Sequence, residues 1–105
     1  MNRMSNDPFA HLQAASDQNR LDLIKTELAL CFTFSTIAAR KYETGNKASA
    51  VSSMVNAEKA YETVIQFLSD PKHSKHLTGE KRLDITAELE RLRERLDRLI
   101  RSFRK

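Results

Sequence analysis

The chain has 105 residues, of which 40% are apolar and 30% are charged, and its net charge is +4. This length fits one small domain and leaves no room for a second independent core. Two glycines, two prolines and no tryptophan disfavour a turn-rich β-sandwich and favour an all-α fold. No catalytic or nucleotide-binding motif is present.

The single cysteine, Cys31, excludes an internal disulfide, and the first twenty residues show no signal-peptide pattern. The most apolar stretch, residues 28–39, is interrupted by Thr33, Ser35 and Thr36 and is shorter than the roughly 20 apolar residues that cross a bilayer. We therefore expect a cytoplasmic protein without a membrane span.

Residues 1–16 are mostly polar with scattered apolar positions, and we predict that they form a flexible tail in front of a helical domain at 17–105. From Asp17 the apolar residues recur in helical step, which predicts a first helix over 17–43 capped by Ser16 or Asp17. This stripe consists of Leu21, Ile24, Leu28, Cys31, Ala38 and Tyr42, and is widened by Leu30, Phe34 and Ile37.

The segment Thr44-Gly45-Asn46 predicts a short turn, so a second helix over 47–69 should pack antiparallel to the first. Pro71 marks the end of this helix. Small residues crowd its first half, where we expect Phe32 and Phe34 of the first helix to fill the space. Its apolar face comprises Ala50, Met54, Ala57, Tyr61, Val64 and Leu68.

Thr78 is the expected N-cap of a third helix over 79–103. Its apolar residues follow the spacing of a heptad repeat, while its other faces are nearly all charged. We therefore predict an antiparallel three-helix bundle. The apolar residues of this third helix are Ile85, Leu89, Leu92, Leu96, Leu99 and Phe103.

The residues around the first turn are similar to the helix-turn-helix of tetratricopeptide repeats, in which small residues let two antiparallel helices pack tightly. Over residues 17–103 the three helices together resemble an MIT domain, the three-helix hairpin of microtubule-interacting and trafficking proteins. That resemblance implies binding of a partner peptide in a groove between helices. The residues that carry the repeat-like pattern are Tyr42, Gly45, Asn46, Ala50 and Ala57, with Lys47 and Met54 where aromatic residues are usual.

Candidate chemical groups are few. His73 and His76 are spaced like metal ligands, but Lys72 and Lys75 beside them oppose a cation, and we interpret the segment as an exposed loop. Cys31 lies on the apolar stripe and is interpreted as a buried, inert thiol. We therefore predict no catalytic residue, metal site or cofactor, and no small-molecule substrate is evident.

The charge is unevenly distributed: residues 1–70 have a net charge of −1 and residues 71–105 a net charge of +5. Arg91, Arg95 and Arg98 follow one side of the third helix beside its leucines, and we predict that they border a partner-binding surface. Neutralisation of this ridge by neighbouring acidic residues is the alternative interpretation.

The first helix also carries more apolar residues than two neighbouring helices need. Either Phe9 and Leu12 of the predicted tail cover this surplus, or another chain does. The surplus residues are Leu23, Leu30, Phe32, Phe34 and Ile37.

These patterns predict a small non-enzymatic interaction module, which acts as an adaptor or scaffold. It would bind a partner helix or peptide in a groove between helices, or associate with itself. The alternative is an electrostatic binder of nucleic acid or of an anionic surface through the basic last helix. The lack of interleaved aromatic residues there makes nucleic acid the less favoured partner.

Overall fold

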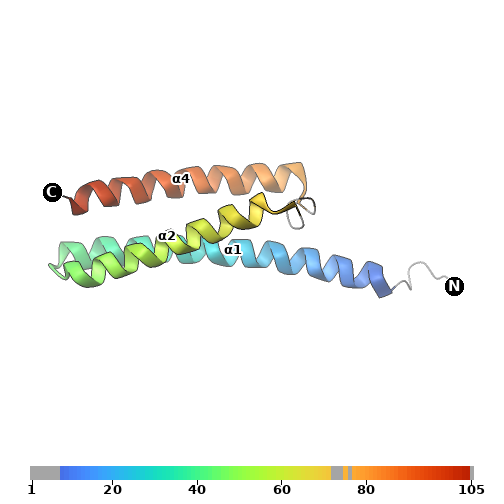
Figure 1. The fold of residues 1–105 in the computed structure, drawn as a ribbon, viewed down its shortest axis with the longest axis horizontal. Helices are drawn as coiled ribbons and strands as arrows, with labels where there is room; N and C mark the ends of the chain where they lie inside the picture. Colours follow the sequence, from blue (N-terminus) through green and yellow to red (C-terminus); the bar gives the residue numbers. More distant parts are fainter. Residues whose placement is uncertain (1–7, 72–74, 76, 105) are drawn as a thin grey trace.

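The computed structural model describes residues 8–71, 75 and 77–104, with side chains from residue 18 onward. Three helices make up these residues: α1 (Pro8–Glu43), α2 (Lys47–Ser69) and α4 (Gly79–Phe103). Figure 1 shows α2 running back along α1 and α4 returning beside them, so α1 and α4 point in the same direction. The predicted all-α, three-helix bundle is confirmed for this part of the chain.

The start of α1 differs from the prediction. A start near Asp17 is wrong, because the helix begins at Pro8 and includes residues 8–16, which the sequence analysis assigned to a flexible tail. Proline suits the first helical position, where its missing N–H is not needed, and alanine-rich sequence follows it. The early part of α1 projects beyond the other helices (Figure 1), in a molecule measuring 66 × 21 × 17 Å.

The ends of the other helices follow the predicted signals. Gly45 has a φ of +88°, a left-handed conformation that closes the turn after α1. Asn46 caps α2, its side-chain oxygen accepting from the Ser49 N–H at 3.3 Å. Thr78 caps α4 as predicted, its hydroxyl oxygen accepting from the Lys81 N–H at 3.2 Å. The bounds of α2 and α4 are therefore confirmed.

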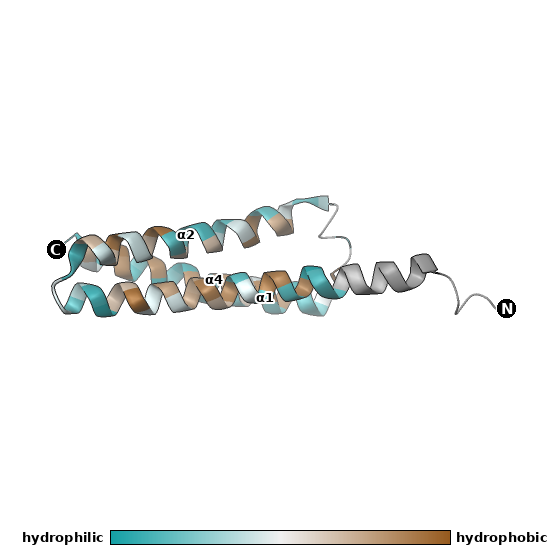
Figure 2. Cartoon of the chain, turned by 90° about the horizontal axis from the view of Figure 1, so that it is seen from below, coloured by the Kyte–Doolittle hydropathy of each residue, from teal (hydrophilic) through white to brown (hydrophobic). Residues whose placement is uncertain are grey.

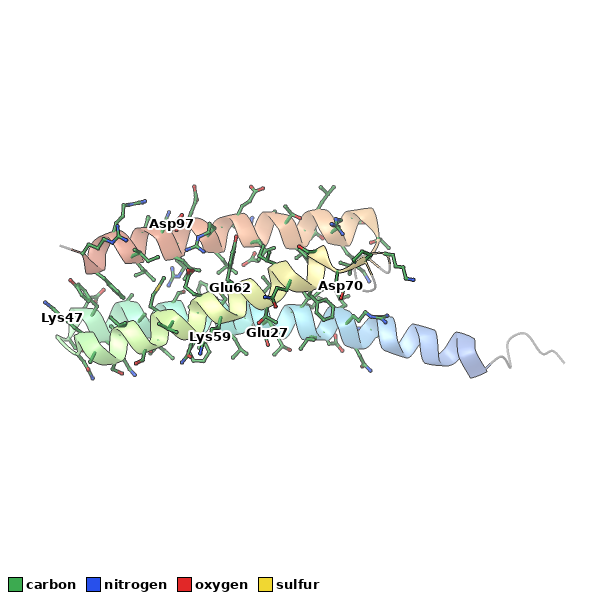
Figure 3. All side chains as sticks on the ribbon, in the orientation of Figure 1. Glu27, Lys47, Lys59, Glu62, Asp70 and Asp97 are labelled. Atoms are coloured by element: carbon green, nitrogen blue, oxygen red, sulfur yellow. The ribbon has the colours of Figure 1, made fainter. Side chains whose placement is uncertain are left out.

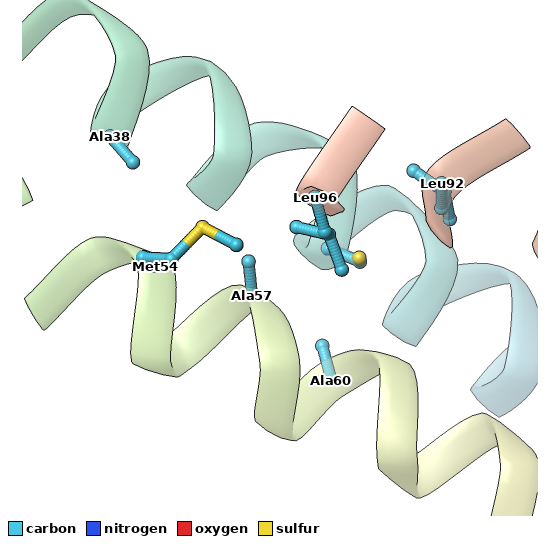
Figure 4. Packing of buried hydrophobic residues seen from close by; sticks show 7 residues of the cluster. Ala38, Met54, Ala57, Ala60, Leu92 and Leu96 are labelled. Carbon is cyan, nitrogen blue, oxygen red and sulfur yellow. The ribbon is translucent and has the colours of Figure 1, made fainter. Parts of the chain in front are cut away.

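Small residues dominate the half of the core near the α1–α2 turn. Figure 4 shows Ala57 of α2 opposite α1, with Leu96 of α4 pointing into the space between them. Of the two phenylalanines predicted to fill this space, Phe34 is partly buried against the cluster, whereas the prediction is wrong for Phe32, which is 51% exposed. Small side chains on both helices let α1 and α2 approach closely here. The buried residues of this cluster are Cys31, Ala38, Met54, Ala57, Ala60, Leu92 and Leu96.

Larger aliphatic residues fill the other half of the core, where α2 leads toward α4. The predicted heptad positions of α4 from Ile85 to Leu96 are buried. At the end of the bundle near the α1–α2 turn, the ring of Tyr42 stacks on that of Phe103, with ring centres 4.5 Å apart. The core therefore holds α4 along most of its length. The second cluster consists of Leu21, Ile24, Val64, Ile85 and Leu89.

Candidate functional site

Two arginines hold α4 against the α1–α2 hairpin from opposite sides. Arg93 and Arg95 are two positions apart, which places them about 200° apart around the helix, one on each flank of the buried leucines. Arg93 reaches α2 and Arg95 reaches α1. The partners of the two guanidinium groups differ in charge.

Arg93 is paired with carboxylates. Its Nη2 lies 2.8 Å from Glu58 Oε1 and 2.9 Å from Asp97 Oδ1, and its Nε donates to Asp97 Oδ1 at 3.0 Å. The guanidinium carbon also lies 4.9 Å from the ring centre of Tyr61. Burial, the largest single influence, lowers the pKa of Arg93, but the bonds to Glu58 and Asp97 outweigh it and raise the pKa. The carboxylates of Glu58 and Asp97 therefore hold Arg93 in place and neutralise its charge.

Arg95 is bound by hydroxyl groups. Its Nε donates to Ser35 Oγ at 2.7 Å and its Nη2 donates to Thr36 Oγ1 at 2.9 Å. Both hydroxyls in turn donate to the Phe32 carbonyl oxygen, at 2.7 and 3.0 Å. The guanidinium carbon lies 4.8 Å from the ring centre of Phe32. One arginine thus contacts a whole turn of α1.

Neutral partners leave the charge of Arg95 uncompensated. None of the ion pairs within 4.0 Å among residues 18–71 and 77–104 includes Arg95. The hydrogen bonds to Ser35 and Thr36 fix the guanidinium in place without cancelling its charge. A positioned positive charge beside a half-exposed aromatic ring is suited to an acidic, apolar partner.

Phe32 and Arg95 lie midway along a groove between α1 and α4. The hollows at its two ends are fourteen residues apart on each helix, from Lys25 to Ala39 on α1 and from Ile85 to Leu99 on α4, which corresponds to roughly 20–25 Å. We call the two hollows, together with Phe32 and Arg95, the α1–α4 groove. The larger hollow, about 450 Å³, is lined by Leu21, Lys25, Thr78, Glu80, Lys81, Asp84 and Ile85. The smaller, about 220 Å³, is lined by Ala39, Tyr42, Glu43, Leu99, Ser102 and Phe103.

The structure separates the three arginines that the sequence analysis grouped. Arg95 forms part of the wall of the groove, whereas Arg91 pairs with Glu88 at 2.6 Å and Arg98 lies 4.0 Å from Glu94. The side chains of Arg91 and Arg98 are largely exposed, so these ion pairs contribute little to stability. Their predicted role in partner binding stays a prediction.

The described side chains include no cluster of three or more metal-ligating residues. His73 and His76 lie outside the described residues. Cys31 is fully buried as predicted, and desolvation, followed by the nearby Glu58 carboxylate, raises the pKa of its thiol to about 11. At neutral pH this sulfur is a protonated thiol rather than a nucleophilic thiolate. Among the helices described, none is long and apolar enough to span a membrane.

Comparison of the chain with protein-family models, with curated proteins and with solved structures finds no match. No residue role is therefore transferred from a relative, and the function is argued from the groove itself.

Sequence reasoning missed the partners of the two arginines. Ser35 could have been singled out from the sequence, because a hydroxyl on the apolar stripe of α1 must find a hydrogen-bond partner once it is buried. Glu58 could not, since an acidic residue beside a core alanine is also typical of a solvated helix face. Only the packing of α4 brings Glu58 and Arg93 together.

Proposed function

We propose that this chain is a non-enzymatic protein-interaction module that binds a partner helix along the α1–α4 groove. The observation that carries the proposal is Phe32, a residue that is 51% exposed at the centre of the groove and whose ring is covered on one side by Arg95. Large aromatic residues flanked by arginine are typical anchors of protein interfaces.

The middle of the groove, at Arg95, favours acidic residues in an amphipathic partner helix, whereas the larger hollow is lined by charges of both signs, Lys25 and Lys81 with Glu80 and Asp84. Apolar side chains of the partner would enter the two hollows and contact Phe32, while its carboxylates would meet Arg95, whose charge is uncompensated. A separation of about 20–25 Å between the hollows corresponds to about 14–16 residues of partner helix. Arg91 and Arg98 lie on the solvent side of this position and would add long-range attraction more than affinity.

The architectural resemblance to MIT domains and tetratricopeptide repeats supports the same class of function. In such hairpins the helices present a groove to a short segment of another protein. Here the corresponding surface would be the α1–α4 groove, whose wall includes Arg95.

A display library of amphipathic helices of about 16 residues, selected against the full chain, tests the proposal. We expect the dominant binders to be acidic along one edge and to lose at least tenfold in affinity against Phe32→Asp. Val51→Asp is the matched control, because Val51 is 52% exposed but lies on α2 outside the groove. Binders that tolerate Phe32→Asp as well as they tolerate Val51→Asp would contradict the proposal.

A salt titration with a random DNA duplex separates this function from electrostatic binding. Binding to phosphates weakens steeply with ionic strength, whereas an apolar helix in a groove is much less sensitive. Tight, salt-sensitive binding of the duplex that survives Phe32→Asp would favour the basic last helix as a binder of anionic polymers instead.

A further inference from the structure

The two ends of the α1–α4 groove differ in the helix ends that they contain. The smaller hollow is formed by the last turns of both helices, because Tyr42 and Glu43 end α1 while Ser102 and Phe103 end α4. The last backbone carbonyl groups of a helix give its C-terminal end a partial negative charge. Two negative helix ends therefore meet at the smaller hollow.

The side chains around the smaller hollow keep this end of the groove negative. Among the described residues that line it, Glu43 alone is charged. Lys47 is near the α1–α2 turn (Figure 3) and lies over the ring of Tyr42, 5.6 Å from its centre. Because Phe103 is stacked on Tyr42, Lys47 must lie over the other face of this ring, and it does not line the hollow.

Other basic residues belong to the same turns but do not line the smaller hollow. Lys41 is directed toward α2, where it donates to Ser49 Oγ at 2.6 Å. The charges of these basic residues act through solvent, where salt screens them, whereas Glu43 and the two helix ends border the hollow directly. The basic residues are Arg40, Lys41, Arg101 and Arg104.

The larger hollow contains a helix end of the opposite sign. α4 begins there, with its cap Thr78 among the lining residues, and the backbone N–H groups of a first turn carry a partial positive charge. α1 does not end at this point, since it begins further away at Pro8. The charged side chains that line this hollow cancel in formal charge: Lys25, Lys81, Glu80 and Asp84.

We propose that the partner helix binds antiparallel to α1 and α4, with its first turn at the smaller hollow and its last turn at the larger hollow. This inference rests on the proposed function. A helix of about 16 residues is long enough to place its two ends at the two hollows. Its positive N-terminal end then meets two negative helix ends and Glu43, and its negative C-terminal end meets the start of α4.

The directions of the three helices favour the same orientation. Figures 1 and 2 view the chain from directions a quarter-turn apart, and in both α1 and α4 lie along the long axis of the molecule. Because α1 and α4 run in the same direction, a partner can be antiparallel to both at once. Around the resulting four-helix bundle, α2, α1, the partner and α4 would alternate in direction.

The centre of the groove does not select a direction. Phe32 and Arg95 lie midway between the hollows, so an acidic residue near the middle of the partner meets Arg95 in either orientation. Only the two ends of the groove distinguish the orientations. A partner that binds in the opposite direction would therefore contradict this inference and leave the proposed function intact.

Disulfide cross-linking of a selected 16-residue helix to the full chain measures its direction. Two versions of the helix carry one cysteine each, in the first or in the last turn. With Ser102→Cys at the smaller hollow, we expect the first-turn version to react at least fivefold faster than the last-turn version. Ser52→Cys, exposed on α2 outside the groove, is the matched control and should react slowly with both, while Cys31 is buried.

A cysteine at the larger hollow separates direction from intrinsic reactivity, because a thiol at a helix N-terminus is the more reactive one in any case. Lys81→Cys should react faster with the last-turn version. The same version reacting faster at both hollows, or the reverse order at each, would overturn the proposed direction. A chain that captures no helix at all would overturn the proposed function together with this inference.

Reversal of the charge at the smaller hollow tests the physical cause. Glu43→Lys should weaken the helix about fivefold at low ionic strength, and the difference should shrink as salt is added. Glu90→Lys is the matched control, because Glu90 is exposed on the side of α4 away from Leu92, and it should bind at least as tightly as the parent chain. Equal affinities of Glu43→Lys and the parent chain at low salt would overturn the inference.

Discussion

The two flanks of α4 solve the same packing problem with different chemistry. On the flank toward α2, Arg93 meets the carboxylates of Glu58 and Asp97, and on the flank toward α1, Arg95 meets the hydroxyls of Ser35 and Thr36. Both guanidinium groups also cover an aromatic ring, at 4.9 and 4.8 Å. The geometry is nearly matched, but the charge balance is not.

This difference distinguishes an arginine whose charge is neutralised within the fold from an arginine whose charge is not. Carboxylates cancel the charge of Arg93 and would oppose an acidic ligand at that flank. Hydroxyls satisfy the hydrogen-bonding directions of Arg95 and leave its positive charge facing the groove. A side chain can therefore be held in place by hydrogen bonds to neutral groups while its charge is not neutralised.

Truncation of Leu96, a buried leucine between the two flanks, should have the largest effect on the stability of the fold. Leu96 is fully buried between the three helices, so Leu96→Ala should lower the free energy of unfolding by about 2–5 kcal/mol, measured by chemical denaturation. The control is Leu83→Ala on the same helix, whose side chain is 72% exposed and whose change should stay within about 0.5 kcal/mol. Similar losses in both variants would show that α4 is not held by its buried residues.

Alkaline pH should weaken the fold through Cys31. The thiol has a pKa of about 11 in the folded chain and near 9 when exposed, so the unfolded state loses its proton first as the pH rises. Stability is fully present below pH 9 and should fall by about 2–3 kcal/mol by pH 11. Denaturation curves of Cys31→Ala should show a shallower decline over this range. Equal slopes in the two chains would contradict the assignment.

Arg93→Gln should cost about 1–2 kcal/mol of stability, because it leaves Glu58 partly buried without its cation. The loss should be smaller in a chain that already carries Glu58→Gln, which a double-mutant cycle measures as a coupling of about 1 kcal/mol. Additive losses would mean that the ion pair is not a stabilising contact.

Arg95→Lys should have the smallest effect on stability, below about 1 kcal/mol, because the Ser35 and Thr36 hydroxyls still donate to the Phe32 carbonyl. The same substitution should weaken the selected helices about tenfold, since lysine cannot reproduce the fork that holds the charge over the groove. A stability loss as large as that of Arg93→Gln, with binding unchanged, would remove the distinction between the flanks.

Local signals account for the parts of the fold that were predicted correctly. Gly45, Asn46 and Thr78 act through their own backbone and the next turn, so the bounds of α2 and α4 follow from short stretches of sequence. The start of α1 did not follow, because residues 8–16 carry only scattered apolar positions, and helical periodicity was the signal on which the start of the helix was predicted. Helical periodicity also identified the leucines of α4 that become buried.

Spacing along one helix could group Arg91, Arg95 and Arg98 but could not distinguish them, since their separation keeps all three on one side. The packing of α4 against α1 placed Arg95 over Phe32 and left Arg91 and Arg98 paired in solvent. The same packing joined Arg93 to Glu58, which lies far away in the sequence. Charge compensation depends on distances between helices, and those distances arise only when the buried side chains of all three helices pack together.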